Sequence, residues 1–265
     1  GGTFQYTWDE PVVYDGAKDP EFVFKFEADG YAPFITRVIH ASEGDVRFDL
    51  RLTPAPSTEV TVLSPDNEPA ANVDIGLASP GARLSLVPGG FYRENIQSGG
   101  TLLMTDSAGH FTLPSDQTIK RVIAASPQGY AEATLADLAA NPVMQLQPWG
   151  QVEGTFAVDG QPSAGRVVSI GFGQDERFDM ISCDSTAFKT TTDDQGRFTI
   201  PVAPPGDHEM VIMDYFTNQF GLSWTSQPLQ PVNISSGTDT VITIDTPPNP
   251  GLTPAMLKKY GVKSN

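Results

Sequence analysis

A duplicated phrase of ten residues constrains the fold of this 265-residue chain more than any other feature. The sequence reads TDSAGHFTLP at 105–114 and TDDQGRFTIP at 192–201, so the second copy starts 87 residues after the first (192 minus 105). A spacing of this size matches a small domain. The phrase therefore predicts two related modules rather than one continuous domain.

The phrase itself is typical of a tight β-hairpin. In each copy an Asp opens the turn, where its carboxylate can accept a backbone N–H two residues later, and a Gly supplies the positive φ that closes the turn. A Phe then starts the buried face of the next strand, and a Pro ends that strand. These structural positions are Asp106, Gly109 and Phe111 in the first copy and Asp193, Gly196 and Phe198 in the second.

Many short β-prone runs, separated by Gly, Pro and polar clusters, predict an all-β fold of tandem antiparallel β-sandwiches of the immunoglobulin-like kind. The 25 Gly and 23 Pro residues suit short strands better than long helices. The predicted divisions are an N-terminally truncated module at 1–55, complete modules at 56–148 and 149–247, and a proline-rich tail at 248–265. In the tail, one short helix is expected from Thr253 to Gly261.

Finer expectations concern strands and loops within the modules. Phe22, Phe24 and Phe26 alternate with other residues, as do the apolar residues of 46–52, and both runs predict strands with one buried face. Residues 78–100 are expected to form a long loop, and residues 173–189 are an insertion before the second hairpin. Long loops are frequent places for binding.

The order of a strand, a Pro-x-Ala step, a second strand, the Thr-Asp-x-x-Gly-x-Phe hairpin and a later Gly-Tyr pair resembles the carboxypeptidase regulatory-like domain. That family is a transthyretin-like β-sandwich, grouped with starch-binding-like folds, and the pattern covers most of residues 57–246. The 149–247 module departs from it by lacking the Gly-Tyr pair. The resemblance implies non-catalytic accessory modules, found in tandem in secreted or envelope-anchored bacterial proteins, that space, stabilise or bind.

Charge and composition limit the classes of partner and of binding site that the chain can have. The formal net charge is -16, which disfavours nucleic acid as a partner, because neutralising phosphates requires clustered Lys and Arg. The single cysteine, Cys183, leaves no intrachain disulfide and no multi-cysteine zinc site. No apolar run is long enough to span a membrane, and no signal peptide opens the sequence, which suggests a mature or excised segment. The compartment follows from none of these features; the resemblance to modules of secreted or envelope-anchored proteins implies an extracytoplasmic location.

Catalytic motifs do not emerge, so the chain is not expected to be an enzyme or to need a cofactor. His40, His110 and His208 occupy separate segments without the spacing of a triad or a zinc site. Carboxylates of one loop could supply oxygen ligands for Ca²⁺, although their spacing matches no calcium motif and a solvated acidic loop is the alternative. These candidate metal ligands are Asp175, Glu176, Asp179 and Asp184.

Aromatic residues interleaved with amides offer a platform on which sugar rings could stack. The candidate ligand-binding residues are Tyr92, Tyr215, Phe216, Asn218, Gln219, Phe220 and Trp224. The leading interpretation is a non-catalytic scaffold, spacer and protein-interaction region of a larger bacterial envelope or secreted protein. The alternatives are a carbohydrate-binding module that uses these aromatic and polar residues, and an accessory region that packs on a catalytic domain. The expected partner is accordingly a protein or a polysaccharide.

Overall fold

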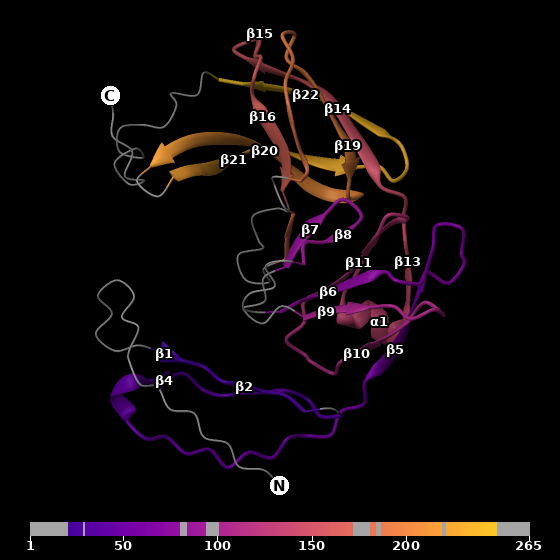
Figure 1. The fold of residues 1–265 in the computed structure, drawn as a ribbon, viewed down its shortest axis with the longest axis vertical. Coiled ribbons are helices and arrows are strands. Elements are labelled where there is room, and N and C mark those ends of the chain that lie inside the picture. The colour runs from indigo at the N-terminus through magenta and orange to yellow at the C-terminus, as the bar shows by residue number, and fades with distance from the viewer. Residues whose placement is uncertain are drawn as a thin grey trace. The chain divides into compact units, whose positions relative to one another are not determined.

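A computed structural model describes residues 21–28, 30–79, 84–93, 101–171, 181–183, 187–218 and 221–247. The structure is almost entirely β, which confirms the predicted fold class (Figure 1). Among the described residues the helices are a 3₁₀ turn at Ala41–Glu43 and α1 at Leu135–Ala140. None of the described helices is long and apolar enough to cross a membrane. The predicted tail helix from Thr253 lies outside the described residues.

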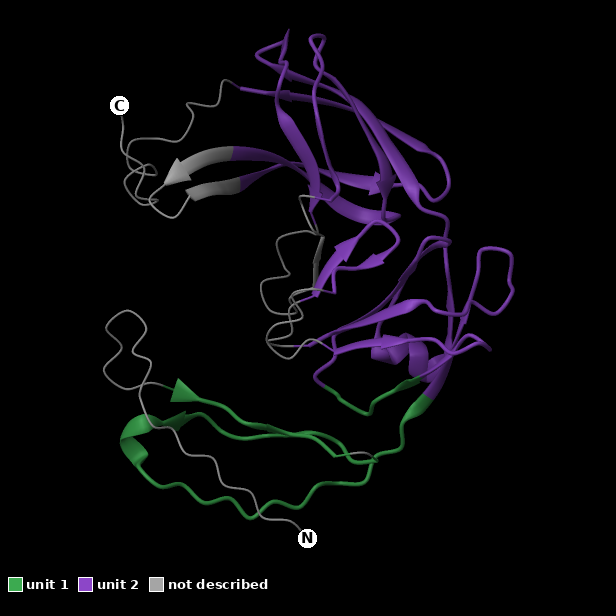
Figure 2. Cartoon of the chain, viewed as in Figure 1, with its two compact units in different colours: residues 1–58, 112–117 green, residues 59–111, 118–265 purple. Residues whose placement is uncertain are grey.

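The chain forms two compact units (Figure 2). Unit 1 comprises residues 1–58 and 112–117, and unit 2 comprises residues 59–111 and 118–265. Almost all of the two modules predicted at 56–148 and 149–247 thus falls within unit 2, and the predicted partial module at 1–55 falls within unit 1.

Unit 1 contains two short ribbons. Strand β1 (Glu21–Phe22) pairs with β4 (Ile39–His40), and β2 (Lys25–Phe26) pairs with β3 (Phe34–Ile35), both antiparallel. The strand predicted at 46–52 is absent from the described structure, although Phe48, Leu50 and Leu52 are half-buried and alternate with exposed neighbours. This segment lacks the ladder of hydrogen bonds that defines a strand, and an isolated bridge between Tyr31 and Pro54 follows it.

The 56–148 module is built from two sheets, with strand orders β12-β11-β6-β9 and β10-β5-β13. In the central strand β11, Val122 to Ala125 are all buried, so both faces of this strand are covered. The strands are β5 (Thr58–Leu63), β6 (Asp74–Ala78), β9 (Thr101–Met104), β10 (His110–Leu113), β11 (Arg121–Ser126), β12 (Gly129–Ala133) and β13 (Val143–Gln145).

The 149–247 module also has two sheets. One has the order β15-β14-β19 with β22 on β14, and the other has the order β18-β16-β20-β21. The strands are β14 (Gly150–Val158), β15 (Gln161–Pro162), β16 (Val167–Gly171), β18 (Lys189–Thr191), β19 (Arg197–Ala203), β20 (Gly206–Asn218), β21 (Gly221–Ile234) and β22 (Asp239–Thr246).

Three short strands occupy segments that the sequence assigned to loops. Within the long loop predicted at 78–100, β7 (Leu84–Val87) and β8 (Gly90–Phe91) form a hairpin that turns at Gly89, where φ is 82°. Within the insertion at 173–189, β17 (Ile181–Cys183) pairs with β7 in parallel. The loop prediction was wrong here, because Leu84, Leu86 and Phe91 are buried in the core.

The sequence predicted antiparallel sheets, but three strand pairs in the described structure are parallel. Strand β13 runs parallel to β5, β22 runs parallel to β14, and β17 runs parallel to β7. Parallel neighbours need a long crossover connection. In the first two pairs most of a module's chain provides that crossover, so the last strand returns to the side of the first.

Both copies of the duplicated phrase form the same turn. In each, the Asp Oδ1 accepts hydrogen bonds from N–H groups two and four residues later, at 2.8 to 2.9 Å. The turn glycines have φ values of 79° and 72°, and each following Phe is buried. These residues are Asp106, Gly109 and Phe111 in one copy and Asp193, Gly196 and Phe198 in the other.

One apolar core runs through both modules of unit 2. It includes Ile123 and Tyr130 of the 56–148 module together with Phe156 and Phe188 of the 149–247 module. Trp149, the first residue of the 149–247 module, packs against this core. The two modules therefore share buried surface rather than meeting only through a linker.

Candidate functional site

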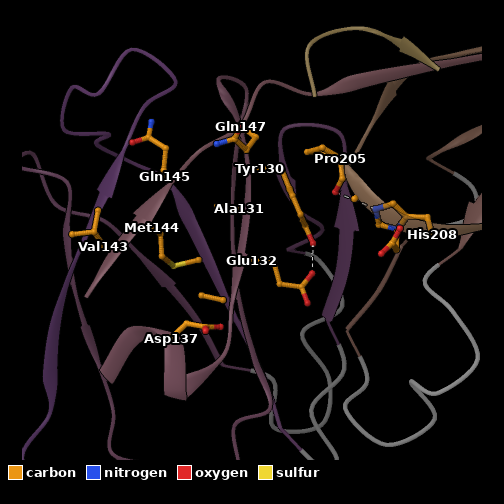
Figure 3. Close-up of a pocket in the computed structure, with 13 residues that line it drawn as sticks. Tyr130, Ala131, Glu132, Asp137, Val143, Met144, Gln145, Gln147, Pro205 and His208 are labelled. Atoms are coloured by element: carbon orange, nitrogen blue, oxygen red, sulfur yellow. Dashed lines mark hydrogen bonds between the residues drawn. The ribbon is translucent and has the colours of Figure 1, made fainter. Parts of the chain in front are cut away.

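The candidate site is a cleft of about 490 Å³ where the two modules of unit 2 meet (Figure 3). Strand β12 and the segment around β13 supply one wall, and the turn between β19 and β20 supplies the other. The polar residues that line it include Tyr130, Glu132, Gln145, Gln147, Asp207 and His208.

A polar network on β11 and β12 forms the first wall. Tyr130 and Glu132 are two residues apart on β12 and therefore share one face of the strand. The Tyr130 hydroxyl donates a 2.7 Å hydrogen bond to Glu132 Oε2, and the two side chains point toward each other in Figure 3. Arg121 Nη1 donates to Glu132 Oε1 at 3.3 Å. The ring of Tyr130 is thereby held with its hydroxyl at the cleft.

His208 lies on the opposite wall, at the start of β20. Its side chain is buried, and Nε2 lies 3.4 Å from the carbonyl oxygen of Pro205. Burial lowers the pKa of His208, and the charge of Arg121 lowers it further. The Pro205 carbonyl and the charges of Glu132 and Asp207 act in the opposite direction but do not reverse the shift. The imidazole is therefore neutral at pH 7.

The carboxylates of the cleft are engaged in holding local structure. Asp137 Oδ2 accepts the Thr134 hydroxyl at 2.7 Å and the Thr134 N–H at 2.9 Å in the capping box of α1, and these bonds lower the pKa of Asp137. Asp207 Oδ1 accepts from Asn233 Nδ2 at 2.6 Å. Over the described ranges, no group of three His, Cys, Asp or Glu side chains is placed to hold a metal ion. The arrangement suits a polar contact surface with fixed side chains.

The structure does not describe the predicted metal ligands. Asp175, Glu176, Asp179 and Asp184 all lie outside the described residues. The calcium hypothesis therefore stays a prediction.

The predicted ligand-binding residues fall on two separate stretches of sequence. Tyr92 follows β8 and is 41% exposed. Tyr215, Phe216 and Asn218 belong to β20 and Trp224 to β21, where the backbone places Tyr215 directly opposite Trp224. Gln219 and Phe220 lie outside the described residues. The segment is the end of a long two-stranded ribbon rather than a loop.

Sequence reasoning missed the residues of the cleft. Tyr130 and Glu132 have the period-two spacing of a strand, which predicts that they share a face but does not predict which other side chains lie beside them. Arg121 and His208 join them only through strand pairing and the contact between modules, for which the local sequence holds no signal. The helix α1 was also missed, although Thr134 and Asp137 have the spacing of a capping box.

Comparison with known proteins identifies no family. No protein-family model matches the chain, and neither does any curated protein. Among solved structures, the chain is similar to a streptococcal ancillary pilin at 13% identity, with a TM-score of 0.32, over 87% of this chain and 76% of that one. It is similar to GBS52, a minor pilin of Streptococcus agalactiae, at 14% identity and a TM-score of 0.34, over 74% of this chain and 97% of that one.

A third similar structure is a 9R-lipoxygenase from Cyanothece, at 17% identity and a TM-score of 0.27, over 39% of this chain and 18% of that one. The three neighbours include both pilins and an enzyme, and all of their TM-scores are below 0.5. These likenesses therefore carry no argument about function.

Proposed function

We propose that the chain is a non-catalytic scaffold, spacer and protein-interaction region of a larger bacterial envelope or secreted protein. The shared core of unit 2 supports this role, because two sandwiches that bury side chains against each other resist bending at their boundary. The resemblance to carboxypeptidase regulatory-like modules supports the extracytoplasmic location. The net charge of -16 keeps such a surface soluble and self-repelling.

The observation that carries the proposal is the position of Trp149 at the module boundary. Its ring centroid lies 5.8 Å from that of Tyr130 in one module and 6.3 Å from that of Phe188 in the other. Its Nε1 donates a 2.8 Å hydrogen bond to the Ser126 carbonyl oxygen. One side chain thus fastens both modules together.

Differential scanning calorimetry tests the proposal. We expect unit 2 of the wild type to unfold in one transition, and we expect Trp149→Ala to separate that transition into two because the aromatic contacts across the boundary are lost. Tyr92→Ala is the matched control, since it removes an exposed aromatic ring from the same unit. A wild type whose two modules melt separately, or a Trp149→Ala variant that still melts as one unit, would contradict a rigid scaffold.

A second candidate function is suggested by the surface of unit 1. Large apolar side chains are exposed on its ribbons and connecting segments, namely Val23, Tyr31, Phe34, Ile35 and Val38. Exposed apolar side chains that form a patch mark a docking surface. This supports the alternative of an accessory region that packs on another domain. A dye that fluoresces on apolar surfaces should bind the wild type and bind Ile35→Thr more weakly; absence of dye binding to the wild type would rule this alternative out.

A further inference from the structure

Strand β22 is an outer strand of the 149–247 module. It pairs with β14 in parallel along its whole length, from the Gln151–Asp239 pair to the Val158–Thr246 pair (Figure 1). Among the described residues, no other strand pairs with β22. Every second residue of β22 therefore directs its N–H and C=O groups away from β14, toward an open edge.

The other outer strands of this module carry features that block strand addition. Strand β21 contains Pro228 and Pro231, and β19 contains Pro201. Strand β15 has two residues, one of which is Pro162, and β18 has three residues, of which the first is Lys189. Proline, lysine and short length are the usual protections of an edge. Strand β22 has eight residues and contains neither proline nor lysine.

The two faces of β22 differ in character. Ile244 is buried and Ile242 packs against the core, whereas Val241 on the outward face is 75% exposed. Asp239 and Asp245 are exposed on the same outward face, at either side of Val241 and Thr243. Asp245 Oδ1 accepts the Gly160 N–H at 3.1 Å, which holds that carboxylate at the end of the strand.

We propose that the open edge of β22 binds, by strand addition, an extended segment of another protein with two basic residues six positions apart around a β-branched centre. The proposal deepens the proposed scaffold function, on which it rests, by naming the class of partner. Residues that lie opposite one another on paired strands share a face, so the basic residues would lie opposite Asp239 and Asp245. The partner residues between them would cover Val241.

A second copy of this chain fits the edge poorly. If two β22 strands paired antiparallel about a two-fold axis at Ile242, Asp239 of each copy would lie opposite Asp245 of the other. Like charges directly opposite each other destabilise a strand pair. The net charge of -16 adds a general repulsion between copies. Charge complementarity therefore favours a basic partner over self-association.

A peptide titration followed by backbone amide NMR tests the proposal. The probe is the capped heptapeptide Lys-Thr-Val-Thr-Val-Thr-Lys, and its matched control has Glu at both ends. We expect the Lys-ended peptide, and not the Glu-ended peptide, to cause saturable chemical-shift changes of the β22 amides. Val241→Lys, which places a charge on an exposed edge position, should weaken binding at least about tenfold without lowering Tm. The double variant Asp239→Lys, Asp245→Lys should bind the Glu-ended peptide instead.

Several outcomes would overturn the proposal: no saturable binding up to about 1 mM peptide, equal binding of the two peptides, or shifts confined to other strands. Sedimentation that shows a dimer of the wild type but not of Val241→Lys would replace the partner with a second copy. The scaffold function is tested separately, because the calorimetry of Trp149→Ala reports on the module boundary and not on the open edge of β22.

Discussion

Trp149 Nε1 donates a hydrogen bond of 2.8 Å to the carbonyl oxygen of Ser126, which links the first residue of the 149–247 module to the end of β11 in the 56–148 module. The residue Ser126 is buried, so water cannot readily replace this donor. The same indole packs between Tyr130 and Phe188. Polar and apolar contributions to the coupling of the modules therefore come from one side chain and can be separated by substitution.

We expect Trp149→Phe to lower the free energy of unfolding of unit 2 by about 1–3 kcal/mol, because it leaves the Ser126 carbonyl without its donor but keeps an aromatic ring. Trp149→Ala should cost more, about 3–5 kcal/mol, because the ring contacts are also lost. Urea unfolding measures both values, with Tyr92→Phe as the control. If the Phe and Ala variants were equally unstable, the ring contacts would contribute nothing.

The turn glycines give a second prediction. A Cβ on Gly109 would lie 2.8 Å from the Val62 carbonyl oxygen and 2.9 Å from the Ala70 nitrogen, and a Cβ on Gly196 would lie closer still to the Phe156 carbonyl oxygen. Gly109→Ala and Gly196→Ala should each combine a positive-φ cost of about 1–2 kcal/mol with a clash of about 1–3 kcal/mol. Thermal unfolding of each variant measures the total.

Gly165→Ala is the matched control for these two variants. Gly165 has a φ of 69°, but nothing lies within 4 Å of the position of its Cβ. Gly165→Ala should therefore destabilise the protein by the positive-φ cost alone. A Gly165→Ala variant as unstable as Gly109→Ala would mean that the close approach of Val62 has no energetic consequence.

The duplicated phrase predicted its own turn geometry because all of its determinants are local. Asp106 bonds to N–H groups two and four residues away, and Gly109 needs a positive φ whatever surrounds it. The alternation of apolar and polar residues along short runs likewise predicted an all-β fold. Such features follow from short stretches of sequence, so they can be inferred before the fold is known.

Features that depend on distant segments could not be inferred in this way. Strand β22 pairs in parallel with β14, which is some 88 residues earlier in the chain (239 minus 151), and no local pattern indicates that partner. His208 reaches the cleft beside Glu132 only because the two modules share a core. The buried hairpin of β7 and β8 was mistaken for a loop because its Pro and Gly residues are those of an exposed turn.

A partly buried ion pair in unit 1 gives a third prediction. Lys25 Nζ lies 2.6 Å from Asp116 Oδ2, and the Asp116 side chain is only 5% exposed. Burial alone would lower the pKa of Lys25, but hydrogen bonds to Asp116 and Glu27 raise it overall. Lys25→Met should deprive the buried carboxylate of this cation and loosen the unit, which hydrogen exchange of residues 21–58 would report as faster exchange.

The double variant Lys25→Met, Asp116→Leu controls for this effect. With the carboxylate also removed, an apolar pair replaces the ion pair, and exchange should return toward the wild-type rate. Equal exchange rates in the single and double variants would show that the loss of Lys25 packing, rather than the loss of the cation beside Asp116, loosens the unit.

The burial of His208 predicts how stability depends on pH. Its pKa is lowered in the folded protein, chiefly by burial, from an unfolded value of about 6.5. Above that pH both states hold a neutral imidazole, and the full stability is present. As the pH falls below about 6.5, the unfolded state binds a proton that the folded state does not, so the free energy of unfolding decreases until the folded pKa is reached.

Urea unfolding at about pH 7.5 and about pH 5.5 measures this decrease. His208→Gln is the control, because glutamine does not titrate while the charges of Glu132, Asp207 and Arg121 that face the site remain. The wild type should lose more stability than His208→Gln between the two pH values. Equal losses would mean that His208 takes up its proton as readily in the folded protein as in the unfolded chain, which is incompatible with an imidazole buried at the module boundary.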